Sequence, residues 1–167
     1  LKIPKHRLRY LSDEEEVRLL AELDPKHPRP FRPDYENRPA EENRKYQDNY
    51  DLVVMLLDTG GRYSEIANLK WDSINLKDGI INLWRPKVRN ESMVYMTSRI
   101  KAILSRRYDS RISNEHVFTN NKGQPRGYQA KGITSSFKRA GIENFRIHDL
   151  RHTCASRLVQ AGLSLYE

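Results

Sequence analysis

The sequence predicts one mainly α-helical domain that carries a small antiparallel β-sheet or hairpin. Its length of 167 residues is close to that of a single domain, so two independent cores are not expected. Apolar residues recur at three- and four-residue spacing in several segments, whereas only two short runs are rich in β-branched and aromatic residues. Helices are therefore expected to supply most of the core.

The first predicted helix begins at a capping box. Ser12 is followed three residues later by Glu15, a pair that satisfies two backbone N–H groups at a helix start. The apolar positions behind this pair recur at helical spacing and predict the buried side: Val17, Leu20 and Leu23. Residues 12–24 hold six acidic side chains against one arginine, so this helix is strongly acidic.

A proline-rich segment follows. Five of the eight prolines lie between Pro25 and Pro39, and each proline removes a backbone donor and fixes φ. We therefore expect residues 25–45 to be an insertion that forms a long, disordered surface loop.

The next predicted helix is the most apolar part of the chain. From Tyr46 to Asp58 the apolar positions recur at helical spacing, and the Gly60-Gly61 pair ends the helix. Its longest apolar run, residues 52–57, is far shorter than the roughly 20 residues of a membrane span, so no transmembrane helix is predicted. A short helix over residues 64–69 is expected to follow.

The second half begins with two β-rich runs, residues 80–84 and 93–96. The polar segment between them contains Asn90, so the two runs predict a β-hairpin that protrudes from the helical body. Three further helices are expected over residues 98–107, 129–140 and 148–161, the last ended by Gly162.

Cysteine usage and the N-terminal residues bear on the cellular compartment. Cys154 is the only cysteine, which excludes an intrachain disulfide and any multi-cysteine zinc site and fits a reducing environment. The basic first ten residues are not followed by the apolar stretch of a signal peptide. A cytoplasmic location is the expectation.

The net charge of +8 is unevenly distributed along the chain. Residues 85–111 hold eight cations against two acidic residues, and residues 122–151 hold seven against two. Basic segments of this kind are typical of a face that neutralises nucleic-acid phosphates, although an ordinary solvated surface is the alternative. The proline-rich segment has aromatic and basic residues that are further candidates for DNA contact: Phe31, Arg32, Tyr35 and Arg38.

The last predicted helix has a polar face with a functional pattern. His148, Arg151 and His152 occupy positions i, i+3 and i+4, so they share one face. An ordinary solvated face would more often carry Glu and Lys. The opposite stripe is expected to face the core: Leu150, Cys154, Leu158 and Ala161.

Further cations complete a set suited to phosphoryl transfer without a metal. Arg62 follows the two glycines, with Glu65 one turn later to orient its guanidinium, and Lys87 lies in the hairpin. Negative charge builds on the two non-bridging oxygens of a phosphodiester in its transition state, and arginine forks can meet that charge with paired hydrogen bonds. A lysine can protonate the leaving alkoxide, and a histidine can move the nucleophile's proton.

Two motifs of the chain resemble the tyrosine recombinase (phage integrase) family. The first is Thr59-Gly60-Gly61-Arg62-Tyr63-Ser64-Glu65-Ile66, with Leu69 and Trp71, and the second is His148-Asp149-Leu150-Arg151-His152-Thr153. The resemblance implies the family's DNA-breaking and rejoining catalytic fold. It also implies a site-specific recombinase or integrase that acts on double-stranded DNA as a homo-tetramer, through a 3′-phosphotyrosyl intermediate and without a metal or other cofactor.

The resemblance also implies roles for individual residues. Arg62 and Arg151 are the two clamp arginines, Lys87 is the general acid for the 5′-hydroxyl, and His148 is the proton-transfer histidine. Supporting residues are Glu65 and His152, and candidate DNA contacts in the hairpin are Arg85 and Arg89.

The chain departs from the family pattern at its ends. The family continues into a Leu-Gly-His segment and a tyrosine-bearing helix, and Tyr166 does not match the context of that tyrosine. We therefore expect residues 1–10 to be a basic linker from an absent N-terminal DNA-binding domain, and residues 11–167 to be a catalytic domain incomplete at its C-terminal end. Two alternatives stay open: a non-catalytic DNA-binding regulator on the same scaffold, and a zinc hydrolase that uses His148 and His152.

Overall fold

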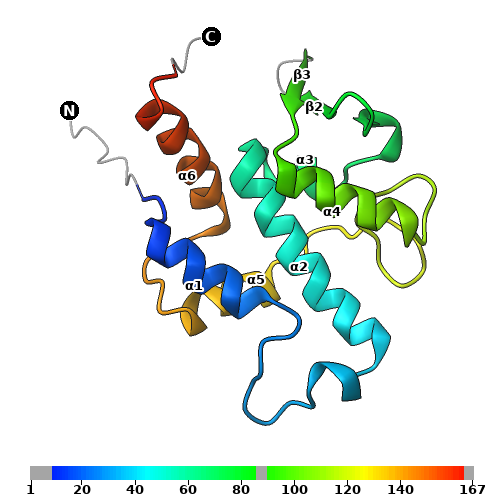
Figure 1. The fold of residues 1–167 in the computed structure, drawn as a ribbon, viewed down its shortest axis with the longest axis vertical. Coiled ribbons are helices and arrows are strands. Elements are labelled where there is room, and N and C mark those ends of the chain that lie inside the picture. The colour runs from blue at the N-terminus through cyan, green and yellow to red at the C-terminus, as the bar shows by residue number, and fades with distance from the viewer. Residues whose placement is uncertain (1–8, 86–89, 164–167) are drawn as a thin grey trace.

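The structure is a computed structural model that describes residues 9–85 and 90–163 (Figure 1). Its α-helices in this part of the chain are α1 (Asp13–Leu23), α2 (Ala40–Thr59), α3 (Tyr63–Ala67), α4 (Ser98–Asp109), α5 (Lys131–Arg139) and α6 (Ile147–Gln160). Two 3₁₀ turns, η1 (Tyr35–Asn37) and η2 (Trp71–Ser73), and three strands, β1 (Ile74–Asn75), β2 (Ile80–Arg85) and β3 (Asn90–Tyr95), complete the described elements. The predicted fold class, mainly α with a small antiparallel sheet, is confirmed.

Helix α2 is the centre of the domain. It contacts α1, α3, α4, α5 and α6, and Figure 1 shows it running through the middle of the molecule. Its residues 51–57 are buried without interruption, so this half of the helix is covered on all sides. Gly60 ends the helix in the left-handed conformation with a φ of 60°, as the Gly60-Gly61 pair predicts.

The sheet has the order β1-β2-β3 with antiparallel pairing throughout. Ile81 and Leu83 of β2 are buried, whereas Asn82 and Trp84 between and beyond them are exposed, so one face of the sheet covers the core. The hairpin prediction is confirmed, and β1 is an addition that the sequence did not indicate because it is only two residues long.

The proline-rich segment differs from the expected disordered loop over residues 25–45. Helix α2 already begins at Ala40, directly after Pro39, and η1 forms a turn before it. Two glutamates in the first turn of α2 favour this early start through the helix dipole. Apolar periodicity does not predict the first turns of α2 because their residues are polar.

Two predicted apolar stripes are only partly correct. Val17 is 69% exposed, and Glu16 is buried in its place beside Leu19 and Leu23. On α6, Leu150 and Cys154 are buried as predicted, but Leu158 is 43% exposed. In α1, ion-pair partners from α4 and α6, rather than hydrophobicity, explain why Glu16 faces inward.

The capping box of α1 is formed as predicted, and its removal is expected to lower the free energy of unfolding. Ser12 Oγ accepts from Glu15 N at 3.2 Å, and Ser12 N donates to Glu15 Oε2 at 3.1 Å. Ser12→Ala is expected to cost about 1 kcal/mol, measured by urea unfolding. Ser135→Ala, in helix α5 and without a capping role, is the control and should change stability by at most about 0.5 kcal/mol.

None of the helices among the described residues is long and apolar enough to cross a bilayer.

Candidate active site

The turn between α2 and α3 positions the first motif. Thr59 Oγ1 donates to the Met55 carbonyl at 2.6 Å and accepts from Gly61 N at 3.1 Å, which fixes the end of α2. The left-handed Gly60 then turns the chain so that Arg62 becomes the N-cap residue of α3. The backbone therefore turns sharply just before Arg62, and the side chain of Arg62 projects from this turn.

Glu65 holds the guanidinium of Arg62 in place. Its Oε1 accepts from Arg62 Nη1 at 2.7 Å, and its Oε2 accepts from the backbone N–H of Arg62 at 2.8 Å. The side chain of Glu65 is only 6% exposed, whereas that of Arg62 is 40% exposed. A buried carboxylate thus orients an arginine whose guanidinium stays accessible, the supporting role that the sequence analysis expects of Glu65.

A cleft of about 530 Å³ opens beside this arginine. It lies between α3 and β2, and Arg62, Glu65 and Trp84 are among its lining residues. A cavity of this size matches the usual range for ligand sites. The cleft therefore places the predicted clamp arginine next to the strand that leads into the hairpin.

Helix α6 brings the second motif to the same turn. Arg151 Nη1 donates to the Gly60 carbonyl at 2.6 Å, two residues before Arg62 in the chain. The rings of His148 and His152 lie edge to face, with their centroids 5.0 Å apart. His148, Arg151 and His152 therefore share one side of α6, as their spacing predicts.

Close packing between α2 and α6 explains this approach. A Cβ at Gly60 would lie 3.2 Å from Cys154 Sγ, so a larger residue would crowd this side chain as well as strain the left-handed backbone. Burial raises the pKa of the Cys154 thiol above its ordinary value, so the thiol stays protonated near neutral pH. Cys154 is consequently a packing residue of this interface.

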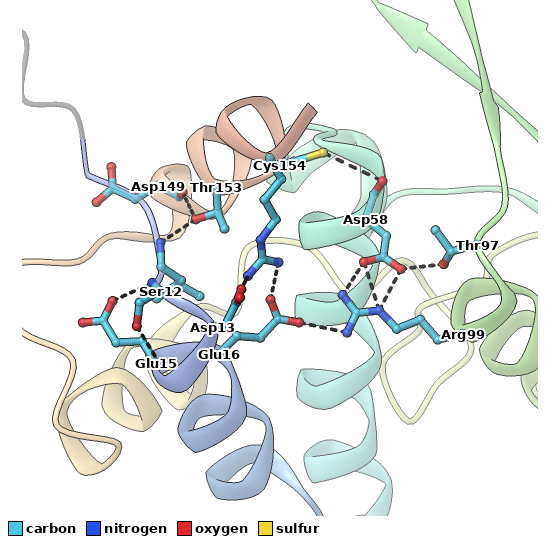
Figure 2. Close-up of polar contacts among 12 residues, drawn as sticks. Ser12, Asp13, Glu15, Glu16, Asp58, Thr97, Arg99, Asp149, Thr153 and Cys154 are labelled. Atoms are coloured by element: carbon cyan, nitrogen blue, oxygen red, sulfur yellow. Dashed lines mark hydrogen bonds and ion pairs between the residues drawn. The ribbon is translucent and has the colours of Figure 1, made fainter. Parts of the chain in front are cut away.

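An ion-pair network behind the turn connects four helices (Figure 2). Arg99 of α4 donates from Nε to Asp58 at the end of α2, at 2.8 Å, and from Nη1 to Glu16 of α1, at 2.9 Å. Arg157 of α6 also binds Glu16. The hydrogen bonds to Asp58, and then those to Glu16, hold the pKa of Arg99 above its ordinary value. The network holds α6 at the end of α2, so it positions both motifs.

The same network corrects the interpretation of the basic segments. Arg99, Arg106 and Arg107 belong to residues 85–111, which we expected to form a face for a polyanion. They pair instead with Asp58, Glu16, Asp48 and Asp51 of α1 and α2. Much of the positive charge of this segment is therefore neutralised within the fold.

Three hairpin residues lie outside the part that the structure describes. Lys87 and Arg89 fall within residues 86–89, and the side chain of Arg85, at the end of β2, is likewise outside the described parts. Their suggested roles stay predictions. A residue that the sequence analysis missed is Tyr63, whose hydroxyl accepts from Gln129 N at 3.1 Å and thereby ties the segment before α5 to the site.

The zinc alternative is not favoured by the surroundings of the two histidines. Asp149, between them in sequence, is buried and accepts from Arg146 N at 2.8 Å, so its carboxylate caps α6. Among the described residues no three His, Cys, Asp or Glu side chains gather into a group that could hold a metal ion. The guanidinium of Arg151, on the same face, adds a positive charge beside any cation there.

Comparison with known proteins shows where these motifs recur. The sequence model of the phage integrase family matches residues 35–167. The integrase of Salmonella phage P22 is 32% identical over 129 residues, which covers 68% of this chain and 33% of that protein. Tyrosine recombinase XerS of Streptococcus pneumoniae is 28% identical over 168 residues, covering 93% of this chain and 45% of the relative. The chain thus spans about a third to a half of the length of these curated relatives.

Solved structures have the same fold. The crystal structure of XerA recombinase superposes with a TM-score of 0.73 and 26% identity, over 99% of this chain and 55% of that one. The catalytic domain of bacteriophage HP1 integrase gives a TM-score of 0.64 and 21% identity, over 96% of this chain and 77% of that one.

Proposed function

Because the chain belongs to the phage integrase family, we propose that it carries out the DNA-cutting and rejoining chemistry of a tyrosine-type site-specific recombinase. The observation that supports this most is the hydrogen bond from Arg151 to the Gly60 carbonyl, since it brings two distant arginine motifs to one turn. Two arginines that reach one turn form a suitable pair for binding a scissile phosphodiester.

In the proposed mechanism Arg62 and Arg151 grip the two non-bridging oxygens of the scissile phosphate. Each guanidinium has five N–H donors in a planar fork, and within the fold Arg62 donates to Glu65 and Arg151 donates to the Gly60 carbonyl. Glu65 and the Gly60 carbonyl fix the two groups before DNA arrives, which lowers the cost of organising them in the transition state.

Proton transfers are assigned to the remaining residues of the set. His148 takes and returns the nucleophile's proton, and the neighbouring His152 ring restricts its orientation. Lys87 of the hairpin protonates the 5′-hydroxyl that leaves. The 3′-phosphotyrosyl intermediate stores the energy of the broken bond, so no metal or nucleotide is needed for rejoining. We assign the nucleophilic tyrosine to none of the described residues.

Double-stranded DNA is the proposed partner, and a homo-tetramer on DNA is the proposed assembly of the whole protein. XerH recombinase, which has the same fold with a TM-score of 0.70 at 23% identity, is described in its structure as bound to a difH substrate. In this arrangement residues 1–10 would link the catalytic domain to an N-terminal DNA-binding domain, and Arg85 and Arg89 of the hairpin would contact DNA.

DNA binding by the 167-residue chain tests the proposal. We expect the logarithm of its binding constant for a duplex to fall linearly with the logarithm of salt, by about 0.9 for each phosphate contacted. We expect no covalent adduct from this chain, whereas the product of the complete reading frame should form one. Absence of salt-dependent DNA binding would reject the proposal, and binding without cleavage by the complete product would favour the regulator.

A further inference from the structure

The segment between α1 and α2 folds around the ring of Tyr46, on the N-terminal part of α2. The guanidinium carbons of Arg29, Arg32 and Arg38 lie 5.0, 5.0 and 4.9 Å from the ring centroid. We call these four residues the arginine–tyrosine cluster. Any two of its guanidinium groups are consequently within about 10 Å of each other, where like charges repel.

Acidic residues of the fold compensate this charge incompletely. Arg29 pairs with Glu22 at 3.2 Å, but Glu22 also pairs with Arg139 at 2.5 Å. Arg32 donates to the Tyr46 hydroxyl and Arg38 donates to a backbone carbonyl, and neither forms an ion pair within the described residues. The cluster therefore has a surplus of positive charge.

Arginine N–H groups without a hydrogen-bond acceptor also indicate a surplus of positive charge in the cluster. The buried Nε of Arg38 has no hydrogen-bond acceptor in the part of the chain that the structure describes, and the buried Nε of Arg29 lies 3.2 Å from Glu22 Oε1 without the geometry of a hydrogen bond. Burial, together with the neighbouring arginines, holds the pKa of Arg29 below its ordinary value. Buried polar groups are usually satisfied, so donors left without a partner at a cationic cavity favour an anionic ligand.

A small cavity lies against the cluster. Its volume is about 180 Å³, and its cationic lining consists of Lys26, Arg29, Arg32 and Arg38, with His27 beside them. Two exposed carboxylates, Asp34 and Glu36, also line it, so four permanent positive charges face two negative ones. The volume is below the roughly 300–1,000 Å³ of sites for drug-sized ligands and suits a small anion.

We propose that the arginine–tyrosine cluster is a phosphate-binding site. Guanidinium groups donate paired hydrogen bonds to phosphate oxygens, and the stacked tyrosine keeps the side chains close together while the site is empty. We take this phosphate to belong to the DNA backbone beside the cleavage point, and this assignment rests on the proposed function. A free phosphate compound is the other source of the same chemistry.

The position of the cluster fits a contact with flanking DNA. Tyr46 lies thirteen residues before Thr59, the last residue of α2, which corresponds to about 20 Å along the helix. A duplex rises about 3.4 Å per base pair, so DNA that ran along α2 would span this distance in about six base pairs.

Arg32 is the residue to replace, because it is exposed and the one hydrogen bond of its side chain in the described structure goes to the Tyr46 hydroxyl. Arg111→Ala is the matched control, since Arg111 is also exposed and stacks on a tyrosine, Tyr108, with 4.1 Å to the ring centroid. Although Arg111 belongs to the basic segment 85–111, its guanidinium already donates to Asn114 Oδ1 at 3.1 Å and to the Tyr108 carbonyl at 2.7 Å. Both variants of the full chain lose one charge. For Arg32→Ala we expect the salt slope on a 30-base-pair duplex to fall by about 0.9, while Arg111→Ala leaves it unchanged.

Titration of the chain with inorganic pyrophosphate, without DNA, tests whether the cluster binds a free phosphate compound. Loss of pyrophosphate binding in Arg32→Ala, about tenfold or more, with an unchanged DNA slope would support the site and assign it to a free phosphate compound. If Arg32→Ala alters neither measurement, or no more than Arg111→Ala does, the cluster is purely structural and the proposal is overturned. If the unaltered chain fails to bind DNA, the proposed function fails, and the pyrophosphate titration still decides whether the cluster binds phosphate.

Discussion

Replacing Arg151 by alanine is expected to lower strand cleavage by about 10²–10³-fold in the product of the complete reading frame, the loss typical of removing one preorganised donor from a charged transition state. The Arg151 guanidinium is held at the Gly60 carbonyl, next to the turn that carries Arg62. Without it, one non-bridging oxygen of the phosphate loses its paired donors. Single-turnover nicking of a duplex that the unaltered protein cleaves is the measurement.

The lysine variant and a distant control separate chemistry from folding. Arg151→Lys keeps the charge but loses the fork, so we expect it to cleave more slowly than the unaltered protein and faster than Arg151→Ala. Arg44→Ala removes an exposed arginine from the N-terminal half of α2 and should cleave at nearly the normal rate on saturating DNA. Cleavage by Arg151→Ala at the rate of Arg44→Ala would contradict the clamp role.

Local patterns in the sequence predict most of the helices, because their causes are local. The capping box at Ser12, the apolar run of α2 and the glycine turn at Gly60 each act within a few residues of the feature that they determine. The polar first turns of α2 and the two-residue strand β1 have no such local mark. For this reason the sequence shows neither of them.

Burial of Glu16 illustrates what local patterns miss. Periodicity places Val17 inside, but Arg99 and Arg157 bind Glu16 from 83 and 141 residues away in the chain. The helix turns so that the carboxylate faces these two arginines. Such pairing is a property of the packed helices, and the spacing of apolar residues within α1 contains no information about it.

The candidate site likewise combines features that the sequence predicts with contacts that it does not predict. The motifs around Arg62 and Arg151 can be recognised from sequence, and the helical spacing of His148, Arg151 and His152 predicts their common face. The supporting contacts cannot be recognised, because the bond from Arg151 to Gly60 joins segments 91 residues apart. Basic composition likewise overestimates the DNA-binding face, since it counts arginines that the fold has already paired.

Asp51→Ala is expected to lower the free energy of unfolding by about 3–5 kcal/mol, the largest stability effect that we predict. The Asp51 side chain is fully buried in α2 and accepts from Arg106 Nη2 at 2.6 Å and from Arg107 Nε at 2.7 Å. Its removal leaves Arg107, which is 11% exposed, with Asp48 as its remaining ion-pair partner in the described structure. For a chain of this size the melting temperature should fall by roughly 6–20 °C, measured by calorimetry.

A surface aspartate gives the matched control. Asp109→Ala, at the exposed end of α4, removes the same charge without breaking a buried pair, so its effect should stay within about 0.5 kcal/mol. Asp51→Asn keeps the shape but removes the charge, and we expect it to destabilise the domain almost as much as Asp51→Ala because both arginines lose the buried carboxylate that they share. If both Asp51 variants lower the free energy of unfolding by less than about 1 kcal/mol, the prediction is contradicted. Water would then replace the carboxylate, and packing around residues 52–57, rather than this ion pair, would join α4 to α2.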